Sequence, residues 1–140
     1  MLPLAYRAFG RAYGPLLRPQ RRFVVKLAKN TEEYHASLKA SEIVVAKFGA
    51  SWCKPCQKSK VFVEELSEEH PDLLFLEVDV DELPQIADEE GVNSIPMYKV
   101  FKYGKSIDVH IGNFAAESHS RSAGGDKQQL KDLIAKHASQ

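Results

Sequence analysis

Residues 43–56 decide the fold, and they read Ile-Val-Val-Ala-Lys-Phe-Gly-Ala-Ser-Trp-Cys-Lys-Pro-Cys. The apolar and β-branched run from Ile43 to Phe48 is typical of a buried strand. We predict that a helix follows from about Pro55 to Glu69, because a proline is accommodated in the first turn of a helix. Cys53 and Cys56, the two cysteines of the 140-residue chain, therefore lie where a strand leads into a helix.

The segments on either side alternate between strand and helix patterns. We predict further strands at 23–28, 73–80, 97–103 and 106–111, with helices beginning near Asn30 or Thr31 and spanning 85–90 and 126–137. Gly104-Lys105 is a hairpin signal, and the apolar-poor stretch 116–126 is interpreted as a loop. This order predicts an α/β fold in which a mixed β-sheet is flanked by helices on both faces.

The position of the two cysteines gives them unequal chemistry. At the start of a helix, unpaired N–H groups and the helix dipole favour the thiolate of Cys53, and Lys54 adds a positive charge nearby. Cys56 is expected to lie one turn further in and to be more buried. This asymmetry predicts that Cys53 attacks a substrate disulfide and that Cys56 then resolves the mixed disulfide.

Other interpretations of the two cysteines are weaker. A structural disulfide between positions three apart would close a small loop and stabilise little. A zinc site needs about four ligands, and the five histidines show no second pair at ligand spacing. An iron–sulfur cluster shared between two chains is possible for a CxxC protein, but nothing in the sequence requires it. We therefore expect no metal and no cofactor.

Ser94-Ile95-Pro96 lies just before the predicted strand 97–103. A cis peptide bond at Pro96 would expose the backbone of Ile95 beside the cysteines, where an extended substrate could pair with it. The alternative is an ordinary trans proline at the start of a strand.

With these motifs in place, residues 23–140 resemble the thioredoxin family. Residues 44–56 resemble its active-site strand and motif, 75–81 its third strand, 91–96 its cis-proline loop, 101–105 its hairpin, and Gly112 its late glycine. The resemblance implies the thioredoxin fold and a protein-disulfide reductase that acts on disulfide-containing proteins. It also implies recharging by an NADPH-dependent thioredoxin reductase, with Cys53 as nucleophile and Cys56 as resolving residue. The resemblance further implies that the substrate docks against Trp52, Ile95, Pro96 and Gly112.

The chain departs from the family pattern at four places. Lys54 replaces the usual glycine beside Pro55, and a cation there predicts a somewhat more oxidising couple. Lys47 replaces a buried aspartate; Glu77 on the neighbouring strand could pair with it as a proton relay, or the two could form a structural ion pair. Val61 replaces a kink proline, so the helix is expected to be straighter. The stretch 116–126 could gate partners or be a solvated insertion.

Two alternative functions remain open from the sequence. The first is a more oxidising disulfide oxidase or isomerase, although such proteins usually carry histidine before the second cysteine and a secretory signal. The second is a thioredoxin-fold binding module without turnover, which the Lys47 substitution keeps in consideration.

Charge is distributed unevenly along the chain. Residues 1–29 contain seven Lys or Arg and no carboxylate, whereas the remainder holds 12 basic and 19 acidic residues. A basic amphipathic segment of this kind is typical of a mitochondrial presequence, which we place at 1–22 before a domain at 23–140. The alternatives are a secretory signal, which Arg7 and Arg11 interrupt, and a basic extension without a targeting role. We expect a monomer of the mitochondrial matrix, or alternatively a cytoplasmic one, that neither spans a membrane nor binds nucleic acid.

Overall fold

The computed structural model describes residues 25–112 and 122–138 of the chain. The predicted presequence 1–22, the first two residues of the predicted strand 23–28, and residues 116–121 of the predicted loop lie outside this part. None of the helices in the described ranges is long and apolar enough to cross a membrane.

A five-stranded mixed sheet forms the centre of the fold, in the order β1-β3-β2-β4-β5. The parallel strands β1, β3 and β2 occupy one half of the sheet, and β4 runs antiparallel to both β2 and β5. Their bounds are Val25–Leu27 (β1), Ile43–Gly49 (β2), Leu74–Asp79 (β3), Met97–Lys102 (β4) and Lys105–Ile111 (β5). The predicted mixed sheet is confirmed.

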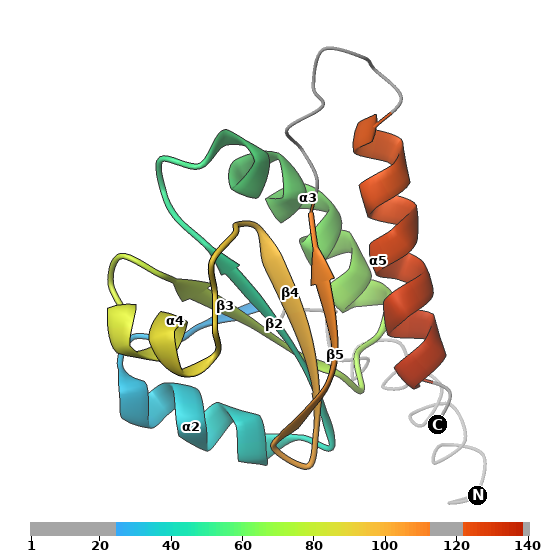
Figure 1. The fold of residues 1–140 in the computed structure, drawn as a ribbon. Coiled ribbons are helices and arrows are strands. Elements are labelled where there is room, and N and C mark those ends of the chain that lie inside the picture. Colours follow the sequence, from blue (N-terminus) through green and yellow to red (C-terminus); the bar gives the residue numbers. More distant parts are fainter. Residues whose placement is uncertain (1–24, 113–121, 139–140) are drawn as a thin grey trace, which may run out of the picture.

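Helices cover both faces of this sheet. Figure 1 shows α3 (Lys54–Glu69) and α5 (Ser122–Ala138) against one face, and α2 (Thr31–Ala40) and α4 (Pro84–Glu89) against the other. Successive residues of a strand point to opposite faces. Val45 of β2 accordingly packs in the core under α3 and α5, whereas Val44 and Ala46 pack under α2 and α4. Because β2 is buried along its whole length, each of its residues faces one of these two cores.

Local signals explain where two of these helices begin. The Asn30 side chain caps α2 by accepting a hydrogen bond from the N–H of Glu33 at 2.8 Å. Cys53 occupies the same capping position of α3, so that helix begins at Lys54, one residue before the prediction.

Two local expectations require correction. Helix α5 begins at Ser122, so residues 122–126 are helical although the low apolar content of 116–126 predicted a loop, and α5 includes two glycines there. Cooperative extension of the backbone hydrogen bonding outweighs a cost of about 1 kcal/mol per glycine. The hairpin turn lies at Tyr103-Gly104, with φ of 51° and 78°, rather than at Gly104-Lys105. At Val61, α3 is uninterrupted and the residue is 61 % exposed; the straighter course expected for this helix stays a prediction.

Candidate active site

A disulfide joins Cys53 and Cys56 at the start of α3, with their Cα atoms 5.2 Å apart. The Sγ atom of Cys53 accepts a hydrogen bond from the backbone N–H of Cys56 at 3.3 Å. This contact shows that the N-terminal donors of α3 point at the sulfur, which is the arrangement that stabilises a thiolate. Both residues are buried, with exposed fractions of 5 % for Cys53 and 2 % for Cys56. The two cysteines therefore differ little in burial; they differ mainly in position, because Cys53 caps α3 and Cys56 lies in its first turn.

The loop before β4 lies against this disulfide. The Ile95–Pro96 peptide bond is cis, and Ile95 packs on the small apolar cluster of Ala50, Cys53 and Cys56. The backbone N–H of Gly112 donates to the carbonyl of Pro96 at 2.9 Å, which ties the end of β5 to this loop. The structure thus brings together three of the residues expected to dock a substrate, namely Ile95, Pro96 and Gly112.

Trp52 presents a large apolar surface beside the cysteines, with 69 % of the residue exposed. Its indole N–H donates to Oδ2 of Asp81 at 2.7 Å, so the ring is held although it is exposed. The backbone N–H of Asp81 is in turn bonded to Oδ1 of Asp79 at 2.9 Å, which fixes the loop after β3. A held, exposed aromatic ring beside a disulfide is suited to contact a protein surface.

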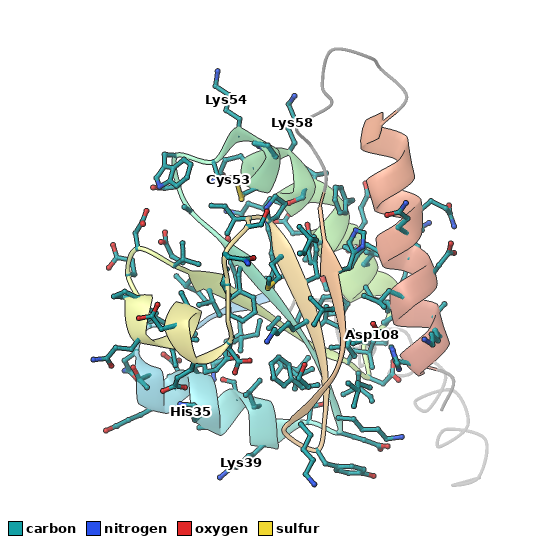
Figure 2. All side chains as sticks on the ribbon, viewed as in Figure 1. His35, Lys39, Cys53, Lys54, Lys58 and Asp108 are labelled. Atoms are coloured by element: carbon teal, nitrogen blue, oxygen red, sulfur yellow. A yellow bond between two sulfur atoms is a disulfide. The ribbon has the colours of Figure 1, made fainter. Side chains whose placement is uncertain are left out.

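The residues between the cysteines differ in accessibility. Lys54 is exposed, and Figure 2 shows its side chain and that of Lys58 extending outward from the end of α3 that carries Cys53. Pro55 occupies the first turn of α3, where its missing N–H leaves no helical acceptor unpaired. The positive charge of Lys54 is therefore on the solvent side of the disulfide.

Lys47 approaches the site from the interior. It is only 4 % exposed, and its Nζ donates to the carbonyl oxygen of Cys56 at 2.8 Å. Glu77 is its register partner on β3, and both residues line one cleft. None of the ion pairs found within the described residues joins Lys47 to Glu77. Burial lowers the pKa of Lys47 below its usual 10.5, while the charge of Glu77 acts to raise it.

Three further residues shape the site and were not identified from the sequence. Asp81 holds Trp52, Ser59 donates its hydroxyl to the Cys56 carbonyl at 2.8 Å, and Gly49 lies directly behind Cys56. A Cβ atom added at Gly49 would lie 3.1 Å from Sγ of Cys56. The glycine between a buried strand and the cysteines was a usable signal, whereas nothing local distinguished Ser59 or Asp81.

The described residues contain no group of three or more His, Cys, Asp or Glu side chains that could hold a metal ion. The chemistry that the arrangement supports directly is thiol–disulfide exchange.

Comparison with known proteins assigns the family. The thioredoxin family profile matches residues 24–122. Thioredoxin 1 of Plasmodium falciparum is 32% identical over 115 residues, which cover 82% of this chain and 99% of that protein. A solved structure of thioredoxin from P. falciparum has a TM-score of 0.69 at 32% identity and covers 81% of this chain and 99% of that one. Oxidised mitochondrial thioredoxin 3 of Saccharomyces cerevisiae has a TM-score of 0.60 at 31% identity, covering 74% of this chain and 94% of that one.

The fold is similar to that of these solved thioredoxins, and this chain carries a CxxC disulfide at the start of α3 with a cis-proline loop beside it. The chain belongs to the thioredoxin family and is a thiol–disulfide oxidoreductase with Cys53 and Cys56 as its redox pair.

Proposed function

We propose that the protein is a reductase of protein disulfides in which Cys53 is the nucleophile and Cys56 the resolving cysteine. The observation that carries this assignment is the capping position of Cys53, whose sulfur already accepts an N–H bond at the start of α3. The Cys53 thiolate attacks one sulfur of a substrate disulfide and releases the other as a thiolate. Cys56 then attacks Cys53, releases the second substrate thiol and closes the internal disulfide.

Substrate docking is assigned to the surface formed by Trp52, Ile95, Pro96 and Gly112. Ile95 packs directly on the cysteine cluster, and the held ring of Trp52 provides exposed apolar area. An extended substrate segment that pairs with the backbone of Ile95 would bring its disulfide to Cys53.

Lys54 and Pro55 are proposed to tune the redox couple. The Lys54 cation favours the Cys53 thiolate and hence the reduced form, so the couple should be somewhat more oxidising than that of an ordinary thioredoxin. A Lys54→Gly variant should have a lower reduction potential, and an unchanged potential would refute this role.

The reduction potential of the Cys53–Cys56 couple, measured against glutathione buffers, tests the reductase assignment. A value near about −270 mV supports a reductase, whereas about −180 mV or higher indicates an oxidase or isomerase. Absence of a titratable disulfide would indicate a binding module without turnover.

The proposed electron donor is an NADPH-dependent thioredoxin reductase, and the proposed working form is a monomer. Residues 1–22 are proposed to act as a presequence for the mitochondrial matrix, with a cytoplasmic location as the alternative. A basic, acid-free N-terminal stretch supports import. A fluorescent fusion of residues 1–30, compared with the same fusion carrying Arg7 and Arg11 as glutamate, tests it: only the unaltered segment should enter mitochondria.

A further inference from the structure

Lys47 is an unusual residue for the middle of a central strand. All seven residues of β2 are buried, and Lys47 is 4 % exposed. Moving an ammonium group out of water is costly unless the group is hydrogen-bonded and its charge is compensated. The surroundings of its Nζ atom therefore indicate what the charge can do.

The Nζ atom of Lys47 lies beneath the first turn of α3. It donates to the carbonyl oxygen of Cys56 at 2.8 Å, and the same oxygen accepts the Ser59 hydroxyl at 2.8 Å. Cys56 is itself only 2 % exposed. The ammonium is thus anchored on the residue that carries the resolving sulfur, on the interior side of the disulfide.

Charged and titratable groups face Lys47 from three elements. Glu77 faces it from β3, Lys60 and Glu64 face it from α3, and Tyr98 is its register partner on β4. The three charged groups and Lys47 line a cleft of about 230 Å³ whose other walls are apolar side chains of β1 and α3. After burial, the strongest influence is the Glu77 carboxylate, which acts to keep Lys47 charged.

We propose that the Lys47 ammonium is a positioning residue that favours the thiolate of Cys56 during resolution of the mixed disulfide. This inference rests on the proposed function, in which Cys56 is the resolving residue. The Cys56 thiol loses its proton to solvent, because a protonated lysine cannot accept one. The thiolate then attacks Sγ of Cys53: the Cys53–Cys56 bond forms, the bond from Cys53 to the substrate sulfur breaks, and the electron pair leaves on the substrate thiolate.

The two lysines of the site then act on different sulfurs. Lys54 extends into solvent at the Cys53 end of α3, where water and salt screen its charge. Lys47 is enclosed behind Cys56, where the effective dielectric constant is lower and a charge acts more strongly. Burial alone disfavours a thiolate at Cys56, and an opposite charge within about 4–6 Å shifts a pKa by roughly one to three units in the favourable direction.

The test measures the ionisation of Cys56 directly. In a Cys53→Ser chain, thiolate formation at Cys56 is followed by ultraviolet absorbance across pH, with and without Lys47→Met. The charge-free Lys47→Gln keeps a polar donor, Lys47→Arg keeps the charge, and thermal unfolding of each variant verifies the fold. We expect Lys47→Met and Lys47→Gln to raise the titration midpoint by about one to three pH units and Lys47→Arg to leave it near the parent value.

Resolution kinetics provide the second readout. In chains with both cysteines, release of a chromophoric thiol from the mixed disulfide at neutral pH should slow about three- to fourfold for each unit of the shift, because the thiolate fraction falls about tenfold while the more basic thiolate is a somewhat better nucleophile. An unchanged midpoint in both charge-free variants overturns the proposal, as does Lys47→Arg behaving like Lys47→Met, which would indicate a neutral lysine acting as a base. Disulfide turnover by the unaltered protein tests the proposed function separately.

Discussion

Gly49→Ala tests how tightly the active-site disulfide is packed against the end of β2. The added Cβ would lie 3.1 Å from Sγ and 3.2 Å from Cβ of Cys56, both shorter than ordinary van der Waals contacts. Neither the backbone at Gly49 nor Cys56 can move easily to relieve these contacts. The Gly49 carbonyl accepts a hydrogen bond from Val80 at 2.9 Å, and Cys56 is held by its disulfide and by Lys47.

The magnitude follows from two opposing effects. Replacing a glycine by alanine at an unstrained φ stabilises a protein by about 0.4–1 kcal/mol through the unfolded chain. Overpacking a rigid site costs about 1–3 kcal/mol. We expect overpacking to exceed the entropic gain because both neighbours are fixed. At roughly 4 °C per kcal/mol, the oxidised protein should lose several degrees of Tm.

Thermal unfolding of the oxidised chain, followed by circular dichroism, measures this loss. A matched pair in the Cys56→Ala background identifies its source: that substitution removes the contact at 3.1 Å but keeps the one at 3.2 Å. The cost of Gly49→Ala should therefore shrink without vanishing. If Gly49→Ala left the Tm of the oxidised protein with both cysteines unchanged or raised it, the reasoning would be refuted, since the site would then relax freely.

Three further predictions concern the cap of α2, an ion pair and the indole contact. Asn30→Ala should lower the free energy of unfolding by about 1 kcal/mol in urea titrations, because it removes the 2.8 Å cap of α2. The hydrogen bond from His137 holds the pKa of Asp108 below its usual 3.8, so the stability it adds is present above about pH 4 and is lost as the pH falls through the lowered value. Asp108→Asn should then lower the free energy of unfolding, measured by urea titration, by under about 1 kcal/mol at pH 7 and by less at pH 3. An equal loss at both pH values would contradict this pH dependence. Asp81→Ala releases the indole of Trp52 and should lower kcat/KM for a protein disulfide while the reduction potential stays unchanged.

The fold was largely predictable because its signals are local and repeated. The apolar, β-branched run that begins at Ile43 is typical of a buried strand, and alternating strand and helix patterns around it led to a mixed sheet covered on both faces. The start of α5 was not predictable in the same way. Gly124 and Gly125 disfavour a helix individually, and the cooperative extension of a long helix through them is not a local property.

In the candidate site, too, some residues were predictable from local patterns and others were not. The positions of Cys53, Cys56 and Pro96 followed from where strands and helices begin, since each lies at such a boundary. The contact of Asp81 with Trp52 joins residues 29 apart in the chain. It depends on how two loops at one end of the sheet lie together, which no pattern within either loop specifies.

Lys47 illustrates both situations in one residue. Strand periodicity places it on the same face of β2 as Val45, and the structure shows that this face packs against α3 and α5. The contact of Nζ with the Cys56 carbonyl could not be predicted from the sequence, because it depends on how α3 packs across the sheet. In the proposed mechanism the Lys47 charge is held at the backbone of Cys56 and acts on its thiolate, and Glu77 affects the reaction only through the protonation state of Lys47. On this proposal, substitution of Glu77 and substitution of Lys47 should have unequal effects. Loss of the Glu77 carboxylate makes Lys47 lose its proton more readily, whereas loss of Lys47 removes the positive charge altogether.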